Sequence, residues 1–341
     1  MRHRLRDRVL RAGALTLAAA AVLAGCAIPV PEVEADPAPE GPQPALDEPR
    51  VDRVLGAVGE ALAAADAAQD PALLAPRVTG PALQTREAEY LLAQATAESE
   101  SPTALQTLTT DPQVIAVSHG EEWPKTIFVF TTIADGMNTP LLLGLQQDDP
   151  RSPYHLFSWV RLLPEVTTPA TAVAAEGSPQ VAPEAEGLVL TPTQTIAAYA
   201  DALSDTESDY ADTFAADVFR TFVSEDRIAI AESVEDAGEY TEAFAADTDV
   251  APVSLGTADG GAIVFGAIRS TQTYERTVDD SEMSVGGQIA LLAGEEESID
   301  VETSVTASYY LTVAFYVPPA ADGATIQVIG AERVLDAVTT E

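Results

Sequence analysis

The sequence predicts an α+β protein with two tandem domains, each built from helices followed by antiparallel strands. Three observations predict this class. Apolar residues make up 46% of the 341 residues, which is enough for a packed interior. They recur at helical spacing early in each half of the chain and alternate in β-type runs later in each half. At about 100 to 200 residues per domain, the length favours two domains.

The N-terminal residues 1–25 predict a secretory signal peptide. Residues 1–11 hold five arginines and a single acid, Asp7, and residues 12–24 are apolar or small. A basic head followed by about 13 apolar residues is typical of a secretory signal, whereas a membrane-spanning helix needs about 20.

This segment ends in Leu23-Ala24-Gly25-Cys26, which resembles the lipobox of bacterial lipoproteins. The resemblance implies diacylglyceryl transfer to the Cys26 thiol, cleavage between Gly25 and Cys26, and retention on the outer, extracytoplasmic face of the cell membrane. A thiolate is the strong nucleophile that takes such a lipid, and small residues before it let a peptidase approach the backbone. The alternatives are a signal peptide with an incidental cysteine and a cysteine buried in an internal helix.

The charge of the chain limits its partners. It has 17 basic and 54 acidic residues and a net charge of −37; removal of residues 1–25 leaves 12 basic and 53 acidic residues, a net charge of −41. No nucleic-acid partner is expected, because phosphate binding needs a basic face. Anionic headgroups repel such a body, so membrane attachment is expected through the lipid alone.

Two low-complexity stretches divide the mature chain. Residues 26–50, with the lipidated cysteine and seven prolines among interspersed acids, are expected to form a disordered tether. Residues 164–187, rich in Thr, Ala, Pro and Glu, are expected to form a linker. The predicted α+β domains are therefore 51–163 and 188–341.

Helical spacing opens each predicted domain. Leu55, Val58 and Leu62 in the first domain match three apolar residues that lie 141 positions later. Thr191-Pro192-Thr193-Gln194 has the pattern of a capping box with proline at the first helical position, which predicts a helix start. Ser224 is predicted to cap a further helix. The three matching residues are Ile196, Tyr199 and Leu203.

Alternating runs predict the strands. Residues 307–317 alternate apolar and mixed side chains, which predicts a half-buried antiparallel strand. The run 127–130 is similar to 263–265, and 154–162 is similar to 309–317 at a larger offset. The helical matches lie 141 positions apart, whereas the last strand match lies 155 positions apart. This increase in separation predicts an insertion in the second domain at about 275–300. The shared order of the matches predicts that the two domains are divergent copies.

Helices followed by a curved antiparallel sheet, in domains of this length, are similar to the cone-shaped fold of the nuclear-transport-factor-like superfamily. The most recognisable pieces are Trp123-Pro124-Lys125 before a strand, and Tyr154-x-Leu156 leading to Leu162-Leu163-Pro164. The layout of lipobox, acidic proline-rich tether and tandem helix-plus-sheet domains also resembles uncharacterised actinobacterial lipoproteins. The superfamily includes enzymes, binding modules and inert scaffolds, so the resemblance implies a fold and no particular activity.

One predicted strand carries the candidate pocket. His155, Phe157, Trp159 and Arg161 alternate along it and are expected to share a face, where they would offer a base, a cation and two stacking surfaces. The alternatives are an outer sheet face and a packing surface for a helix. The opposite face is expected to pack against helices through Leu156, Val160 and Leu162.

The sequence offers no pattern for catalysis or metal binding. The mature chain has two histidines, His119 and His155, and its motifs do not include HExxH, CxxC, GxSxG, SxxK or a phosphate loop. Two acidic clusters, at 279–282 and 295–302, lack the glycine of a calcium loop and are predicted to be solvated. No catalytic role, metal or cofactor is expected.

These observations together predict a lipid-anchored, surface-exposed protein of the cell envelope with a binding or scaffolding role. Its expected partners are the membrane, through the diacylglyceryl anchor, and an envelope protein. The alternative is a small-molecule-binding lipoprotein that delivers a solute to a membrane partner. A ligand that co-purifies with the soluble part would favour the alternative, and a crosslinked membrane protein would favour the scaffold.

Overall fold

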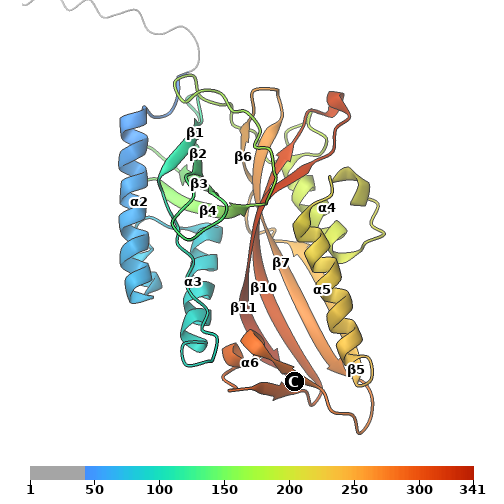
Figure 1. Ribbon diagram of the computed structural model, residues 1–341. Helices are drawn as coiled ribbons and strands as arrows, with labels where there is room; N and C mark the ends of the chain where they lie inside the picture. The colour runs from blue at the N-terminus through green and yellow to red at the C-terminus, as the bar shows by residue number, and fades with distance from the viewer. Residues whose placement is uncertain (1–42) are drawn as a thin grey trace, which may run out of the picture. The chain divides into compact units, whose positions relative to one another are not determined.

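The computed structural model describes residues 43–341, and each half of this range begins with two helices and continues into antiparallel strands (Figure 1). The predicted α+β class is therefore confirmed. The first half contains α2 (Glu48–Ala68), α3 (Gly80–Ala95), β1 (Pro112–Val117), β2 (Lys125–Thr131), β3 (Leu141–Gln147) and β4 (His155–Leu162). The second half contains α4 (Pro192–Ser204), α5 (Val218–Val234), β5 (Gly238–Ala246), β6 (Val253–Gly256), β7 (Ala262–Arg276), β10 (Ser304–Val317) and β11 (Gln327–Thr340).

The predicted insertion lies between β7 and β10. It consists of the paired strands β8 (Ser284–Gly286) and β9 (Ser298–Asp300) with the short helix α6 (Gly287–Ala293) between them. In the first half, β2 is followed directly by β3, its partner in the sheet. The second half therefore carries an extra substructure where the sequence predicts one.

The last residues of the predicted tether belong to the fold. The Asp47 carboxylate accepts a hydrogen bond from the backbone N of Arg50 at 3.0 Å and so caps α2. Pro44 forms an isolated β-bridge with His119. Residues 26–42 lie outside the described residues, and for them the tether stays a prediction.

Capping side chains also fix the starts of the later helices. The Thr191 capping box is confirmed, because the Thr191 hydroxyl and the Gln194 side chain each accept a hydrogen bond from the other residue's backbone N–H. The prediction for Ser224 is wrong: α5 begins at Val218 behind Asp217, whose carboxylate caps it, and Ser224 lies inside the helix. No described helix has both the length and the apolar run that crossing a bilayer requires.

One sheet of nine strands runs through both halves, in the order β1-β2-β3-β4-β11-β10-β7-β5, with β6 also paired to β7. Each half contributes an antiparallel meander, and the meanders join through their last strands. This join pairs Leu162 with Gly330 and Arg161 with Ala331, antiparallel. The last strands of the two meanders thus pair with each other, antiparallel, and the shared order of helices and strands in the two halves supports the predicted duplication.

The predicted match between residues 154–162 and 309–317 is wrong by one strand. Residues 155–162 form β4, the fourth strand of its meander, whereas 309–317 lie in β10, the third strand of the other. The counterpart of β4 is β11. Apolar alternation recurs in every buried strand, so spacing alone does not distinguish neighbouring strands.

Residues 164–187, predicted as a linker, lie against both halves. Ser178 is buried and forms an isolated bridge with Ser118 of the first half, and Gln180 forms one with Leu255 of the second. Residues 42–341 form one compact unit. That 51–163 and 188–341 also fold separately stays a prediction.

Apolar residues are buried on both faces of the sheet. Under α4 and α5, the ring of Tyr199 packs edge-on against Phe315, with 5.2 Å between centroids. On the other face, Phe128 of the first half meets Phe265 of the second edge-on, also at 5.2 Å. The strand predicted to be half-buried, β10, is therefore covered on both sides, and even its Tyr310 is fully buried.

Candidate functional site

The predicted lipid site lies outside the described residues. Cys26 and the lipobox residues Leu23, Ala24 and Gly25 precede residue 43. Lipidation of Cys26 therefore stays a prediction.

The four side chains of the predicted pocket do not line one cavity. A β-bulge interrupts β4, because Leu145 of β3 pairs with Leu156 and the preceding Gly144 pairs with Ser158, which leaves Phe157 without a partner. The bulge breaks the expected alternation. As a result Trp159 lies in the same apolar cluster as Leu156 and is fully buried.

The other three residues of the predicted pocket separate. Phe157 lines a cavity of about 560 Å³ beside residues 180–183 and 249–254. Arg161 donates to Glu332 of β11 at 3.1 Å. His155 is half-buried, and burial lowers its pKa although Asp148 opposes that shift. Trp159 fits the alternative that this face packs against helices, because its apolar cluster includes residues of α2 and α3.

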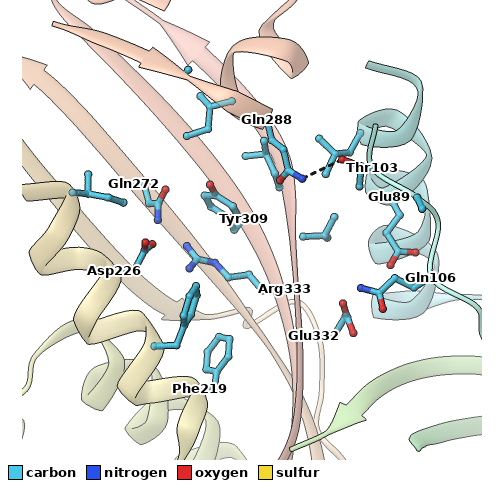
Figure 2. Close-up of a pocket in the computed structure, with 18 of the residues that line it drawn as sticks. Glu89, Thr103, Gln106, Phe219, Asp226, Gln272, Gln288, Tyr309, Glu332 and Arg333 are labelled. Carbon is cyan, nitrogen blue, oxygen red and sulfur yellow. Dashed lines mark hydrogen bonds between the residues drawn. The ribbon is translucent and has the colours of Figure 1, made fainter. Parts of the chain in front are cut away.

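A different place brings charged and aromatic side chains of both halves together: a groove between α3 and α5 (Figure 2). It encloses about 520 Å³. Its walls come from α3, the loop 103–106, α5, α6 and strands β7, β10 and β11. The residues labelled in Figure 2 are Glu89, Thr103, Gln106, Phe219, Asp226, Gln272, Gln288, Tyr309, Glu332 and Arg333.

Buried Arg86 organises the first wall. Its guanidinium donates to the Asp66 carboxylate at 2.6 and 2.9 Å and to Glu89 at 2.6 Å. It also donates to the Gln106 carbonyl at 3.1 Å, which ties the loop 103–106 to α3. Tyr90 adds a 2.6 Å hydrogen bond to Asp66. With 1% of the Arg86 side chain exposed, the network holds Glu89 in place at the groove.

Two carboxylates, Glu89 and Glu332, lie along this wall, and both have a raised pKa. Burial raises the pKa of Glu89 to about 7 against the opposing Arg86, and the charge of Glu332 adds to the rise. Burial likewise raises the pKa of Glu332, against the opposing Arg161. Both groups are acceptors with lone pairs beyond those that their arginines use.

Arg333 organises the opposite wall. It donates to the buried Glu242 carboxylate at 2.7 Å, and its guanidinium lies 4.1 Å from the centre of the Tyr309 ring. Gln272 donates to the same carboxylate at 3.1 Å. The aromatic Phe219 of α5 lies beside this group (Figure 2). This wall offers aromatic surface and a cation held in one position.

The top of the groove is closed by a polar contact between the halves. The Gln288 side chain of α6 donates to the Thr103 hydroxyl at 3.1 Å, the dashed line in Figure 2. Among residues 43–341, no group of three or more His, Cys, Asp or Glu side chains is placed to hold a metal ion. The arrangement is suited to binding through fixed charges, amides and aromatic faces.

Sequence reasoning missed the groove because its residues come from distant elements. One signal existed: Glu332 and Arg333 interrupt the otherwise apolar run 328–335. Charged residues in the middle of a buried strand need partners, and such partners often mark a site.

Comparison with protein-family models gives a match over most of the chain. The family described as Domain of unknown function (DUF8094) matches residues 42–338. No curated protein and no solved structure matches the chain.

Proposed function

Because the chain belongs to the DUF8094 family, whose description names no activity, we propose a function from its own residues. The protein is held on the outer face of the cell membrane by a diacylglyceryl group on Cys26, and it binds an envelope protein in the groove between α3 and α5. Binding, with no chemical step, is the proposed role.

The observation that carries this proposal is that the charged walls of the groove are fixed before any ligand arrives. Arg86 is buried and is held by Asp66 and Glu89, Arg333 is held by the buried Glu242, and both halves of the chain contribute to the lining. Side chains that are already ordered lose little conformational entropy on binding. The anchor rests on Leu23-Ala24-Gly25-Cys26 after a basic, then apolar segment.

A photocrosslinking experiment in the native cell tests the proposal. Ala104 is exposed and lines the groove, so benzoylphenylalanine at this position should yield a discrete protein adduct on illumination. Ala216 also lies in an exposed loop but is outside the lining of the groove, and serves as the matched control. Loss of the adduct at position 104, or the same adducts from both positions, would refute binding in the groove.

The volume of the groove favours a second candidate, a small solute. About 520 Å³ lies within the usual range of small-molecule sites, about 300–1,000 Å³. In that case a low-mass compound should be released when the purified wild-type chain is denatured. Ala104→Trp should remove it and Ala216→Trp should not, and position 104 should give no protein adduct.

A further inference from the structure

We infer that the partner enters the groove as an extended peptide that pairs with the free edge of β11. The inference rests on the proposed function, since it names the form of the partner at the same groove.

The groove reaches around the edge of β11. Four consecutive residues, 332–335, line it. Successive side chains of a strand point to opposite faces of the sheet. A cavity that contacts four in a row therefore touches both faces and the edge between them. Figure 2 agrees: Glu89 and Glu332 lie on one side of the strand, and Tyr309 and Arg333 on the other.

The backbone groups at this edge have no strand neighbour. β4 pairs with β11 only at Gly330 and Ala331 and then diverges. Ser304 and Glu341 exchange two backbone hydrogen bonds, so the even-numbered residues of β10 direct theirs to β11, and their partners Gly330, Glu332 and Val334 face β10. Ala331 therefore directs its backbone groups toward β4, where it pairs with Arg161. By the same alternation Arg333 and Leu335 direct theirs to that side. Within residues 43–341, no hydrogen bond satisfies them there.

This geometry matches strand addition, in which main-chain hydrogen bonds give affinity and alternate side chains give specificity. The edge lies in a groove between α3 and α5, and these helices cover it against edge-to-edge pairing with a second copy of the protein.

The two faces of the sheet beside the β11 edge differ in the side chains that they can bind. On one face Glu89 and Glu332, each paired with an arginine, keep free lone pairs that can accept from a cationic group, and the net charge of −37 adds a long-range attraction. On the other face the Arg333 charge is opposed by its partner Glu242 and by Asp226 of α5, and Phe219 and Tyr309 offer aromatic surface. The peptide that fits therefore alternates basic with apolar or aromatic residues.

The probe is acetyl-Val-Lys-Phe-Lys-Val-amide, titrated calorimetrically into the full chain in nonionic detergent. Two N-methylated versions of this peptide are isomers of each other and have the same charge. One carries a methyl group on the backbone nitrogen of the phenylalanine, and the other carries it on the backbone nitrogen of the second lysine. Neighbouring N–H groups of a strand point to opposite edges, so only one of these methyl groups removes a hydrogen bond to β11. We expect one isomer to bind about tenfold more weakly than the parent and the other to bind within about threefold of it.

Equal affinity of the two isomers would overturn strand pairing and leave only electrostatic attraction. If the parent peptide does not bind but position 104 still gives its adduct, the peptide inference fails and the proposed function stands. If the parent peptide does not bind and position 104 gives no adduct, the peptide inference and the proposed function both fail.

A pair of variants on α3 tests the side-chain assignment. Glu89 faces the groove, whereas Glu87 of the same helix is exposed and outside it. Glu89→Gln keeps a carbonyl acceptor but removes the charge, and should weaken the parent peptide about threefold to tenfold, the effect of about one ordinary hydrogen bond, whereas Glu87→Gln should leave it unchanged. Equal effects of the two substitutions would contradict the assignment. Glu332→Gln, on the same face, provides a second variant should Glu89→Gln fail to fold.

Discussion

Replacing Arg86 with methionine removes the cation that holds the first wall of the groove together. Methionine fills much of the space of the arginine stem but leaves Asp66 and Glu89 without a counter-charge and the Gln106 carbonyl without its donor. Breaking a buried ion pair from one side costs about 3–5 kcal/mol, because the remaining charge stays buried. Asp66 is 26% exposed and can be rehydrated in part, so Glu89, at 11%, carries most of the loss.

The loss should depend on pH through Glu89. Burial already raises the pKa of Glu89 from 4.5 to about 7 with Arg86 in place. Removing Arg86, the main opposing charge, raises it further. A group whose pKa is higher in the folded state adds stability below its unfolded-state pKa, and that stability is lost as the pH rises through the folded-state value. Arg86→Met should therefore cost least near pH 5 and most above pH 7.

Urea unfolding followed by circular dichroism at pH 5 and pH 8 measures both effects. Arg53→Met is the matched control, because Arg53 lies exposed on α2 and should change the free energy of unfolding by less than about 0.5 kcal/mol. A loss below about 1 kcal/mol at pH 8, or the same loss at both pH values, would refute the argument from burial.

Three further predictions concern the anchor, the division of the chain and the core. Cys26→Ser should abolish labelling by an alkyne fatty acid, because a hydroxyl does not replace the thiol in the lipid transfer; equal label on both chains would contradict lipidation. Fragments 45–166 and 186–341 should each melt cooperatively if the halves fold alone, and an unfolded fragment would place the boundary or the interface elsewhere. Trp159→Ala should cost about 3–5 kcal/mol and Leu156→Ala about 2–5 kcal/mol, since both side chains are fully buried. His155→Ala should cost less than about 1 kcal/mol, and denaturant unfolding that ranks it beside Trp159→Ala would contradict these positions.

Local patterns could be predicted from the sequence because short-range physics determines them. The Thr191 capping box is complete within four residues, and the spacing of Leu55, Val58 and Leu62 places all three on the buried face of α2. Alternation over 307–317 likewise gives a strand. The chain order of helices, strands and insertion follows from such signals.

The groove could not be predicted because it depends on which strands meet. Glu89 and Arg333 lie in different halves and become neighbours only because β4 pairs with β11. The pocket prediction was wrong for a related reason: an unpaired Phe157 shifts the alternation of β4, and nothing in the pattern of that strand marks the bulge. Burial of both faces of β10 similarly follows from α3, which belongs to the other half.

The join between the halves has a thermodynamic consequence. β4 and β11 share two residue pairs, whereas β10 and β11 share twelve, so backbone pairing between the halves is sparse compared with pairing within a half. The join therefore depends on apolar contacts between the halves, such as that of Phe128 with Phe265, more than on its backbone pairing. A ligand that contacts both walls of the groove binds the two halves to each other. Occupation of the groove and closure of the join are thus linked equilibria, and each stabilises the other by the same amount.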